Sequence, residues 1–300
     1  MHKIGFIGLG IMGKPMAQNL MEAGYPLSFY ARRPEVIQEM TAAGAFFMSS
    51  PKAVAESTDI VMTIVTADAQ VREVMLGPDG VLEGAYEGQL IVDLSTISPI
   101  TIREIADIAA KKGVHVMDAP VSGGDTGAKT GTLTIITGGS REDFNRSLEI
   151  LKVLGKEENI FHVGQVGTGQ TVKMVNQFIG GITIAAIAEA LVLGIKAGAD
   201  PEKMCRVISV SSGNSALFQA RAQDYLLKNY FEPAFFLDLM KKDMDIGITM
   251  AKTLNIPTPI GSAAYQMFLA ASGMGMGKMD FSAVCKAIET LSGVKIAASK

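Results

Sequence analysis

A run of glycines near the start of the chain has the spacing of a phosphate-binding turn. Gly8, Gly10 and Gly13 form the pattern G-x-G-x-x-G, between an apolar run at 4–7 and a stretch of helical periodicity over 11–23. In dinucleotide-binding folds these glycines allow a tight turn, close approach of a pyrophosphate, and close packing of helix on strand. The helix N-terminus also offers free N–H groups to phosphates. We therefore predict a cofactor site formed by Gly8, Leu9, Gly10, Ile11, Met12 and Gly13. The alternative is a structural glycine turn in another α/β protein.

The end of the second predicted strand bears on which nucleotide is bound. NAD-binding folds usually carry Asp or Glu there, which accepts a hydrogen bond from the ribose 2′-hydroxyl. This chain has Ala31, followed by Arg32 and Arg33. A planar guanidinium suits a 2′-phosphate, so we predict a preference for NADP(H), with NAD(H) possible. The competing interpretation is a pair of solvated arginines at a strand end.

A lysine and an asparagine lie at helical spacing in the apolar stretch that follows residue 167. Lys173 and Asn176 share one helix face, and Gly180 on that face would allow another backbone to approach closely. A lysine ammonium can donate a proton to a carbonyl oxygen as hydride arrives, and it can stabilise the developing alkoxide. Spacing alone nevertheless favours an ordinary exposed lysine.

Strand and helix patterns alternate through the first half of the chain, which must position these residues. The predicted strands are 4–7, 27–30, 45–47, 60–65, 90–93, 114–119, 133–137 and 160–163. Ser50-Pro51 and Ser98-Pro99 each predict a helix start, with a capping serine and a proline at the first helical position. Such alternation predicts crossover units and a mainly parallel sheet with helices on both faces.

Helical patterns dominate the second half. One long helix is predicted over 167–197, and shorter ones over 201–211, 215–228, 237–253, 262–271 and 281–292. The fold class is therefore α/β: a Rossmann dinucleotide-binding domain over 1–163, then an all-helical domain over 164–300 that is entered by the long helix.

Composition limits the partners of this chain. Its 300 residues fit two domains, and the net charge of −3 gives no general reason to expect nucleic acid. Cys205 and Cys285 lie far apart and are expected to be free buried thiols. The three histidines belong to no ligand cluster, so no metal site is predicted.

One apolar stretch, 178–195, approaches membrane-spanning length. It contains Glu189 and adjacent glycines at 180 and 181, so we expect a buried helix rather than a membrane span. Glycines also interrupt the apolar run near the N-terminus, and no signal-peptide cleavage site closes that run. We therefore expect no membrane partner and a cytoplasmic location.

Four motifs in order make the sequence similar to one family, the 3-hydroxyisobutyrate dehydrogenase-like or β-hydroxyacid dehydrogenases. They are the N-terminal glycine signature 5–16, the loop 118–124 (DAPVSGG), the segment 164–177 around Lys173, and the Lys-Asp motif 238–243. The resemblance runs essentially from end to end. It reverses the expectation for Lys173, because the family carries its catalytic lysine there.

The resemblance implies roles for further residues. It makes Lys173 the catalytic lysine with Asn176 beside it, and it assigns the substrate carboxylate to Ser122, Gly123 and Gly124. The remaining cofactor positions that it implies are Ala31, Val65, Thr66, Gln70, Thr96 and Lys242. Val65-Thr66 stands where relatives usually have Leu-Pro, and Gln70 stands where Asn is common. NAD-using relatives carry Asp at the Ala31 position, which supports NADP(H).

The family resembles 6-phosphogluconate dehydrogenase in plan, with the active site expected in a cleft between the domains. Its members usually form dimers or tetramers through the helical domain. The expected reaction is hydride transfer between NADP(H) and a small carboxylate-bearing 3-hydroxy acid or its semialdehyde. Within the family the sequence as a whole resembles tartronate semialdehyde reductases and 2-(hydroxymethyl)glutarate dehydrogenases, and both have nearly the same loop as 118–124. Glyoxylate–succinic semialdehyde reductases are a further resemblance. The second domain would set the chain length of the substrate.

Two other classes of function remain open at this point. One is an imine reductase-like oxidoreductase, which shares the two-domain plan but often lacks the lysine. The other is a non-catalytic nucleotide-binding module, which the retained Lys173 and Asn176 argue against.

Overall fold

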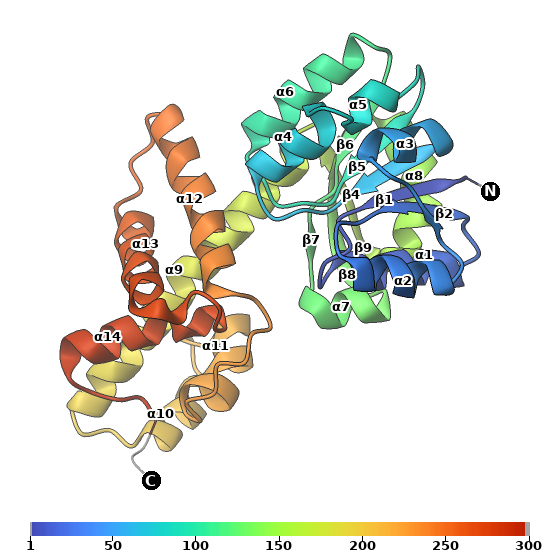
Figure 1. Ribbon diagram of the computed structural model, residues 1–300. Helices are drawn as coiled ribbons and strands as arrows, with labels where there is room; N and C mark the ends of the chain where they lie inside the picture. Colours follow the sequence, from blue (N-terminus) through green and yellow to red (C-terminus); the bar gives the residue numbers. More distant parts are fainter. Residues whose placement is uncertain (1, 298–300) are drawn as a thin grey trace. The chain divides into compact units, whose positions relative to one another are not determined.

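The computed structural model describes residues 2–297, and the chain divides into two compact units (Figure 1). The first unit is Met1–Lys173 and the second is Met174–Lys300. The boundary expected between residues 163 and 164 falls before the long helix, whereas the compact first unit includes that helix's first turns.

The first unit is built on a nine-stranded sheet within the described residues. Its strands are β1 (Ile4–Ile7), β2 (Leu27–Tyr30), β3 (Phe46–Phe47), β4 (Ile60–Thr63), β5 (Leu90–Asp93), β6 (His115–Asp118), β7 (Val121–Ser122), β8 (Leu133–Gly138) and β9 (Gly155–Gly164). The order is β3-β2-β1-β4-β5-β6-β8-β7, and β9 also pairs with β8. Strands β1 to β6 pair in parallel, and β8 runs antiparallel to β6 and β7. The predicted Rossmann-type sheet is confirmed.

Helices cover both faces of this sheet (Figure 1). They are α1 (Gly13–Glu22), α2 (Pro34–Ala42), α3 (Pro51–Ser57), α4 (Asp68–Leu76), α5 (Val81–Gly84), α6 (Pro99–Ala110), α7 (Gly124–Thr130) and α8 (Arg141–Leu154). Both predicted Ser-Pro starts are confirmed: the Ser50 side chain accepts from Ala53 N, and the Ser98 side chain accepts from Ile100 N.

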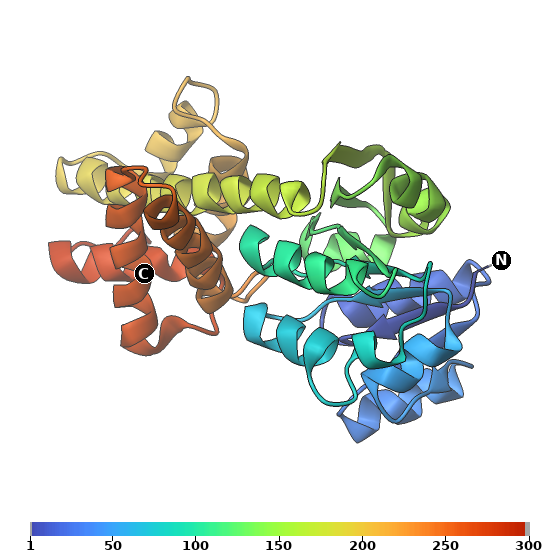
Figure 2. The same cartoon turned by 90° about the horizontal axis from the view of Figure 1, so that it is seen from above.

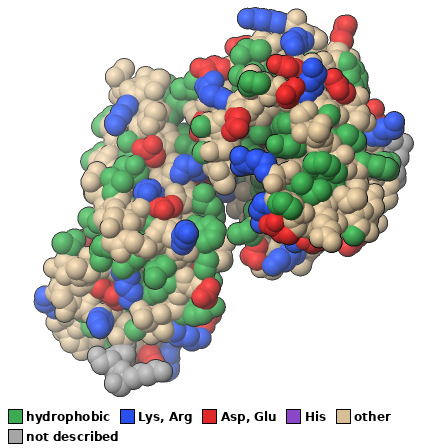
Figure 3. All heavy atoms as spheres, in the orientation of Figure 1, with side chains coloured by type: hydrophobic (Ala, Val, Ile, Leu, Met, Phe, Trp, Pro, Cys, Tyr) green, Lys and Arg blue, Asp and Glu red, His purple; other side chains and the backbone are tan. Residues whose placement is uncertain are grey.

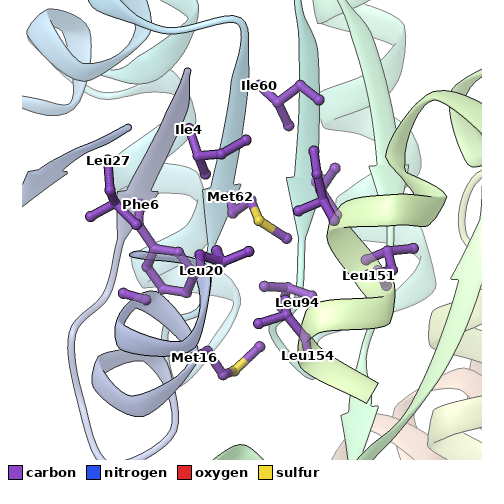
Figure 4. Close-up of a cluster of buried hydrophobic side chains, with 14 of the residues drawn as sticks. Ile4, Phe6, Met16, Leu20, Leu27, Ile60, Met62, Leu94, Leu151 and Leu154 are labelled. Atoms are coloured by element: carbon purple, nitrogen blue, oxygen red, sulfur yellow. The ribbon is translucent and has the colours of Figure 1, made fainter. Parts of the chain in front are cut away.

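Alternation along the strands divides the interior into two cores. Successive strand residues point to opposite faces, so Ile60 and Met62 of β4 join one core and Val61 joins the other. The first core includes side chains from α1 and α8, such as Leu20 and Leu151 (Figure 4). Helices α3 to α6 supply the second core. A central parallel sheet buried on both faces explains the continuous apolar runs of its strands.

The second unit is helical, as predicted. It contains most of α9 (Thr168–Lys196), a long continuous helix in Figure 2. The other α-helices are α10 (Pro201–Ile208), α11 (Ala216–Arg221), α12 (Leu237–Thr253), α13 (Pro259–Ala271) and α14 (Cys285–Ser292). Short π- and 3-10 segments lie at Ala222–Leu226 (η1), Ser272–Met276 (η2) and Phe281–Val284 (η3). Cys205 and Cys285 are both free and buried, as expected.

The close approach predicted at Gly180 occurs one residue later. A Cβ at Gly180 would lie 3.8 Å from its nearest neighbours, which is ordinary contact distance, whereas one at Gly181 would lie 2.3 Å from Met244 Sδ of α12. The Phe178 ring likewise leaves no room for a side chain at two glycines: a Cβ would lie 2.7 Å from the ring at Gly247 of α12 and 2.1 Å from it at Gly261 of α13. A shift of one residue turns the helix by about 100°, so spacing alone selects the face only approximately.

Helix α9 is long and apolar enough to cross a membrane by length and composition alone, and 33% of its most apolar window is buried inside the protein. Large side chains such as Ile179 and Leu193 remain exposed on it. In the chain by itself α9 therefore has one buried face and one uncovered face, so the expected burial is partial.

Candidate active site

The carboxyl ends of the parallel strands bring polar residues into one row. Ile7, Thr63, Asp93 and Asp118 are the last residues of β1, β4, β5 and β6, and each is in register with the next across the sheet. The strand order also reverses between β1 and β4, since β2 lies on the far side of β1. Ligands of open α/β sheets bind outside the carboxyl ends of the strands at such a reversal.

The three glycines of the first turn meet different surroundings. Gly8 has φ +102°, and a Cβ there would lie 2.0 Å from Ile64 O. At Gly13 a Cβ would lie 2.0 Å from Gly8 O. At Gly10 a Cβ would meet no atom within 4 Å. The fold itself therefore requires Gly8 and Gly13, whereas the open space at Gly10 fits a pyrophosphate that approaches the backbone.

The N-terminus of α1 is suited to hold phosphate. No side chain caps it, and its first turn carries no acidic residue. The remaining loop members, Leu9, Ile11 and Met12, connect β1 to this helix end, and Ile11 is exposed. The positive end of the helix dipole and its free N–H groups are thus available to an anion.

The two arginines after β2 do different things. Arg33 Nη2 donates to Leu9 O at 2.9 Å, so this side chain braces the glycine loop. Arg32 is exposed at the strand end, and Ala31 before it is half-buried. Arg33 also lies 3.8 Å from Glu35. Of the pair, Arg32 has the side chain that the glycine loop leaves available for a nucleotide.

Asp93 is a hub that connects the loops after β4 and β5. Its Oδ1 accepts from Thr63 Oγ1 and from Ser95 Oγ, both at 2.7 Å, while Ser95 Oγ accepts from Val65 N at 2.9 Å. Complete burial raises the pKa of Asp93 to about 6, against the hydrogen bonds from Ser95 and Thr63 that lower it. Oδ2 of Asp93 is buried and has no hydrogen-bond partner among the described residues.

Asp118 and Gln170 attach the start of α9 to the sheet. Asp118 accepts from Gly167 N at 2.6 Å and from Gln170 N at 2.7 Å. The Gln170 side chain accepts from Ile97 N and donates to Ser95 O. Burial raises the pKa of Asp118 to about 6, although its backbone hydrogen bonds lower it.

Both predicted catalytic residues lie on α9, Lys173 about one turn beyond Gln170 and Asn176 about one turn further. The Lys173 side chain is 5% exposed, which contradicts the ordinary exposed lysine that spacing alone favours. Asn176 belongs to the second unit, where its Nδ2 donates to Gln177 Oε1 at 3.1 Å. Gln177 in turn donates to Asp243 Oδ2 at 2.7 Å, and Asp243 forms an ion pair with Lys242 at 2.8 Å. A polar chain within the helical unit thus links two predicted site residues, Asn176 and Lys242.

The predicted carboxylate-binding residues form the turn from β7 into α7. Gly123 has φ +134° and Gly124 has φ +63°, conformations that side chains rarely adopt, and Ser122 is half-buried. Asn19 of α1 donates to Ala128 O of α7 at 2.9 Å, which ties this turn to the helix behind the glycine loop.

The other predicted cofactor positions of the first unit lie on the loops after β4 and β5 or on α4. Val65 and Thr96 are half-buried and Thr66 is exposed. Gln70 is on α4, and its Oε1 is buried without a hydrogen-bond partner among residues 2–297. The structure therefore brings the glycine loop, Val65 and Thr96 to the same sheet edge as the start of α9.

Comparison with known proteins identifies the family of this chain. Residues 3–164 match the model of the NAD-binding domain of 6-phosphogluconate dehydrogenase. Residues 167–288 match that of the NAD-binding region of NADP-dependent 3-hydroxyisobutyrate dehydrogenase. The chain belongs to the 3-hydroxyisobutyrate dehydrogenase-like family.

Individual relatives align with this chain over almost their whole length. The chain is 41% identical to 2-(hydroxymethyl)glutarate dehydrogenase of Eubacterium barkeri over 98% of this chain and 97% of that protein. It is 37% identical to 2-hydroxy-3-oxopropionate reductase of Escherichia coli over 98% of this chain and all of that one. A solved 3-hydroxyisobutyrate dehydrogenase of Mycobacterium tuberculosis, in a structure with L-serine, has 30% identity and a TM-score of 0.86, covering 96% of this chain and 99% of that one. The protein is an NAD(P)-dependent 3-hydroxyacid dehydrogenase.

For this dehydrogenase, motif comparison leaves several buried polar residues without a role, some in each of the two units. Asp93, Ser95, Asp118, Gln170 and Asp243 have no assigned role in the sequence analysis. Asp118, Gln170 and Asp243 do fall inside three of the four motifs, and Asp93 ends a predicted strand. For Asp93 and Asp118, a polar residue that ends or interrupts a buried apolar run is the signal that would have singled them out, because a buried carboxylate must find hydrogen-bond donors.

Proposed function

We propose that this enzyme reduces a small carboxylate-bearing semialdehyde with NADPH, in equilibrium with the corresponding 3-hydroxy acid, and that Lys173 transfers the proton. A bound nicotinamide cofactor supplies hydride to the carbonyl carbon. Lys173 donates a proton to the carbonyl oxygen, which becomes the hydroxyl group, and takes that proton back in the oxidative direction. The observation that carries this is a lysine only 5% exposed, one turn beyond the residues that tie α9 to the edge of the sheet.

The substrate carboxylate is proposed to bind Ser122, Gly123 and Gly124. Glycines without side chains let an anion approach backbone N–H groups, and the serine hydroxyl adds a donor. The solved mycobacterial relative was obtained with L-serine, itself a 3-hydroxy acid with a carboxylate. Asn176 is proposed to orient the substrate or Lys173. The names of relatives support tartronate semialdehyde, which is 2-hydroxy-3-oxopropionate, and methylmalonate semialdehyde, the oxidation product of 3-hydroxyisobutyrate. Succinic semialdehyde is a further candidate, although its reduction gives a 4-hydroxy acid.

NADP(H) is proposed as the preferred cofactor, and NAD(H) as a possible one. No carboxylate stands at Ala31 to bind a ribose 2′-hydroxyl, and Arg32 is exposed at that strand end. Residues 8–13 would hold the pyrophosphate, with Arg33 bracing the loop, while Val65, Thr66, Gln70 and Thr96 would line the nicotinamide half. Lys242 is proposed to reach the cofactor from the helical unit.

A homodimer or homotetramer is proposed to form through the helical unit. A groove of about 1120 Å³ runs between α9, α13 and α14, and its lining is predominantly apolar. Leu193, Ile260 and Leu291 in this lining are 71%, 71% and 76% exposed. The space-filling view shows apolar side chains interspersed with charged ones on the face that it draws (Figure 3). A second copy that covers the groove would bury the uncovered face of α9. We propose no membrane or nucleic-acid partner for the protein, and a cytoplasmic location.

The test is loss of NADPH and NADH absorbance with tartronate, methylmalonate and succinic semialdehydes and glyoxylate. Lys173→Ala is expected to lower kcat about 100- to 10,000-fold on the best aldehyde, the usual contribution of general acid–base catalysis. Turnover by Lys173→Ala equal to wild type would refute the assignment of the proton donor. A cyclic imine in the same panel separates this reaction from imine reduction.

Arg32→Ala tests the cofactor preference. The ratio of kcat/KM for NADPH to that for NADH should fall about tenfold or more, because a charge-assisted contact to phosphate is lost. Arg33→Ala is the matched control: it removes the hydrogen bond to Leu9 O and should weaken the binding of NADPH and NADH to a similar extent. An unchanged ratio in Arg32→Ala would contradict the preference.

A further inference from the structure

The side chain of Gln170 forms hydrogen bonds to the loop after β5 on both sides of Thr96. Its Oε1 accepts from Ile97 N at 3.1 Å, and its Nε2 donates to Ser95 O at 2.7 Å. Gln170 is completely buried, and Ser95 and Ile97 are nearly so. The two bonds span the residue proposed to lie beside the nicotinamide ribose, so the amide fixes the loop there.

The backbone of the same residue is held from the other side. Asp118 Oδ2 accepts from Gln170 N, and Asp118 Oδ1 accepts from Gly167 N, which fixes the first turn of α9 at the end of β6. The helix lies so close to β8 that a Cβ at Gly169 would be 2.3 Å from Ile136 O. The start of α9 therefore has no room to slide on the sheet.

Lys173 follows Gln170 by three residues, which places it on the same helix face about 4.5 Å further along the axis. The position of its backbone is thus set by the contacts that Gln170 makes. These contacts join, within one unit, the loop that would face the nicotinamide and the turn that carries the proposed proton donor.

We propose that Gln170, with Asp118 behind it, is a positioning residue that sets the place of Lys173 relative to the nicotinamide loop. The inference rests on the proposed function, because it assigns Gln170 an effect through Lys173. Hydrogen bonds suit this role, since they are directional, and misplacement of a catalytic group by about 1 Å can cost 100-fold in rate.

The test compares Gln170→Met, which keeps length and loses both hydrogen bonds, with wild type. We expect kcat to fall about tenfold or more, while the aldehyde KM changes far less, because the variant misplaces the proton donor without removing any group that touches the substrate. Gln170→Glu is a second variant of the same shape that keeps an acceptor for Ile97 N but places an oxygen against Ser95 O. It should also lose activity.

The decisive measurement is a double-mutant cycle with Lys173→Ala. If Gln170 acts through Lys173, Gln170→Met should have no further effect on the residual turnover of Lys173→Ala. An equal fold loss in both backgrounds, or unchanged kcat in Gln170→Met alone, would overturn the proposal. Thr171→Val is the matched control, since its hydroxyl donates to Gly167 O, just before α9, and contacts neither the nicotinamide loop nor Asp118. It should leave kcat unchanged.

Hydrogen exchange without substrate separates this inference from the proposed function. Gln170→Met should speed exchange of amides in residues 168–175 and leave residues 185–196 of the same helix unchanged. Unchanged exchange in both segments would show that the contacts do not hold the helix, whatever the enzyme turns over. Equal activity of wild type and Lys173→Ala would instead refute the proposed proton donor while the exchange result stands.

Discussion

The two ends of α9 are stabilised by different forces. Its first turn is held by buried hydrogen bonds to Asp118, Ser95 and Ile97 in the sheet unit. Further along, Ile184, Ala188 and other apolar side chains join the core of the helical unit. On its remaining surface large apolar side chains stay exposed beside the groove.

The two kinds of contact do different jobs: hydrogen bonds fix the position of a group, and apolar contacts cover a surface. Hydrogen bonds are directional and costly to leave unmade when buried, so they fix the end of α9 that carries Lys173. Apolar burial is not directional and scales with area, so it can be completed by any well-fitting partner, including a second copy. The sheet unit should therefore respond sharply to single-atom changes, and the groove to added charge.

The largest effect is expected at the glycine loop, where the sheet unit has no spare room. Gly8→Ala combines a positive φ with a Cβ 2.0 Å from Ile64 O. It should lower the free energy of unfolding of the first unit on the order of 3 kcal/mol. Denaturant unfolding followed by fluorescence or circular dichroism measures the loss.

Gly10→Ala is the control at the same turn. A Cβ there meets no atom of the described chain within 4 Å, so stability should match wild type. The dissociation constant of NADPH should nevertheless rise about tenfold or more, since the methyl group occupies the proposed phosphate position. Equal stability losses at both glycines would show that crowding by the fold does not distinguish them.

The next effect concerns the groove. Leu193→Glu places a charge where a second copy is proposed to pack, and a buried unpaired charge costs several kcal/mol, enough to raise a dimer dissociation constant about 100-fold. Analytical ultracentrifugation should show a shift toward monomer. Val210→Glu, at a side chain 87% exposed and outside the groove, should leave association unchanged. Dissociation by both variants, or by neither, would argue against the groove.

Local pattern predicts most of the elements but not the contacts that cross the fold. The strand runs, the Ser-Pro helix starts and the glycine turn each depend on near neighbours in sequence, and the structure confirms them. Short pieces such as β7 and α7 go unpredicted, since two and seven residues carry too little periodicity.

The candidate site divides in the same way. The glycines and Lys173 are found from motifs, because their neighbours in sequence define them. Gln170 lies in the same motif as Lys173, but its role does not follow from the motif, because its side-chain partners lie 73 and 75 residues away and are backbone groups that any residue could offer. Likewise, Gly181 rather than Gly180 meets α12, a distinction that only helix packing decides.

The smallest effect is expected from the charge of Asp93, and it has a pH signature. Burial raises the pKa of Asp93 from 3.8 to about 6, so the folded state holds a proton that the unfolded chain releases between those values. The free energy of unfolding therefore falls as pH rises through this window and stays lower above it. Asp93→Asn removes the buried charge while Oδ1 can still accept from Thr63 and Ser95. It should be more stable than wild type by on the order of 1–2 kcal/mol at about pH 7.5, and by less at about pH 5.

Urea unfolding at both pH values tests this, with the exposed Asp224→Asn as a control that should show no pH-dependent gain in stability. A gain in stability that is the same at both pH values would mean that Asp93→Asn differs from wild type through its packing rather than through its charge. A loss at about pH 7.5 would mean that the ionised carboxylate is stabilised by its two hydroxyl donors more than burial penalises it, so that the site edge tolerates a charge there.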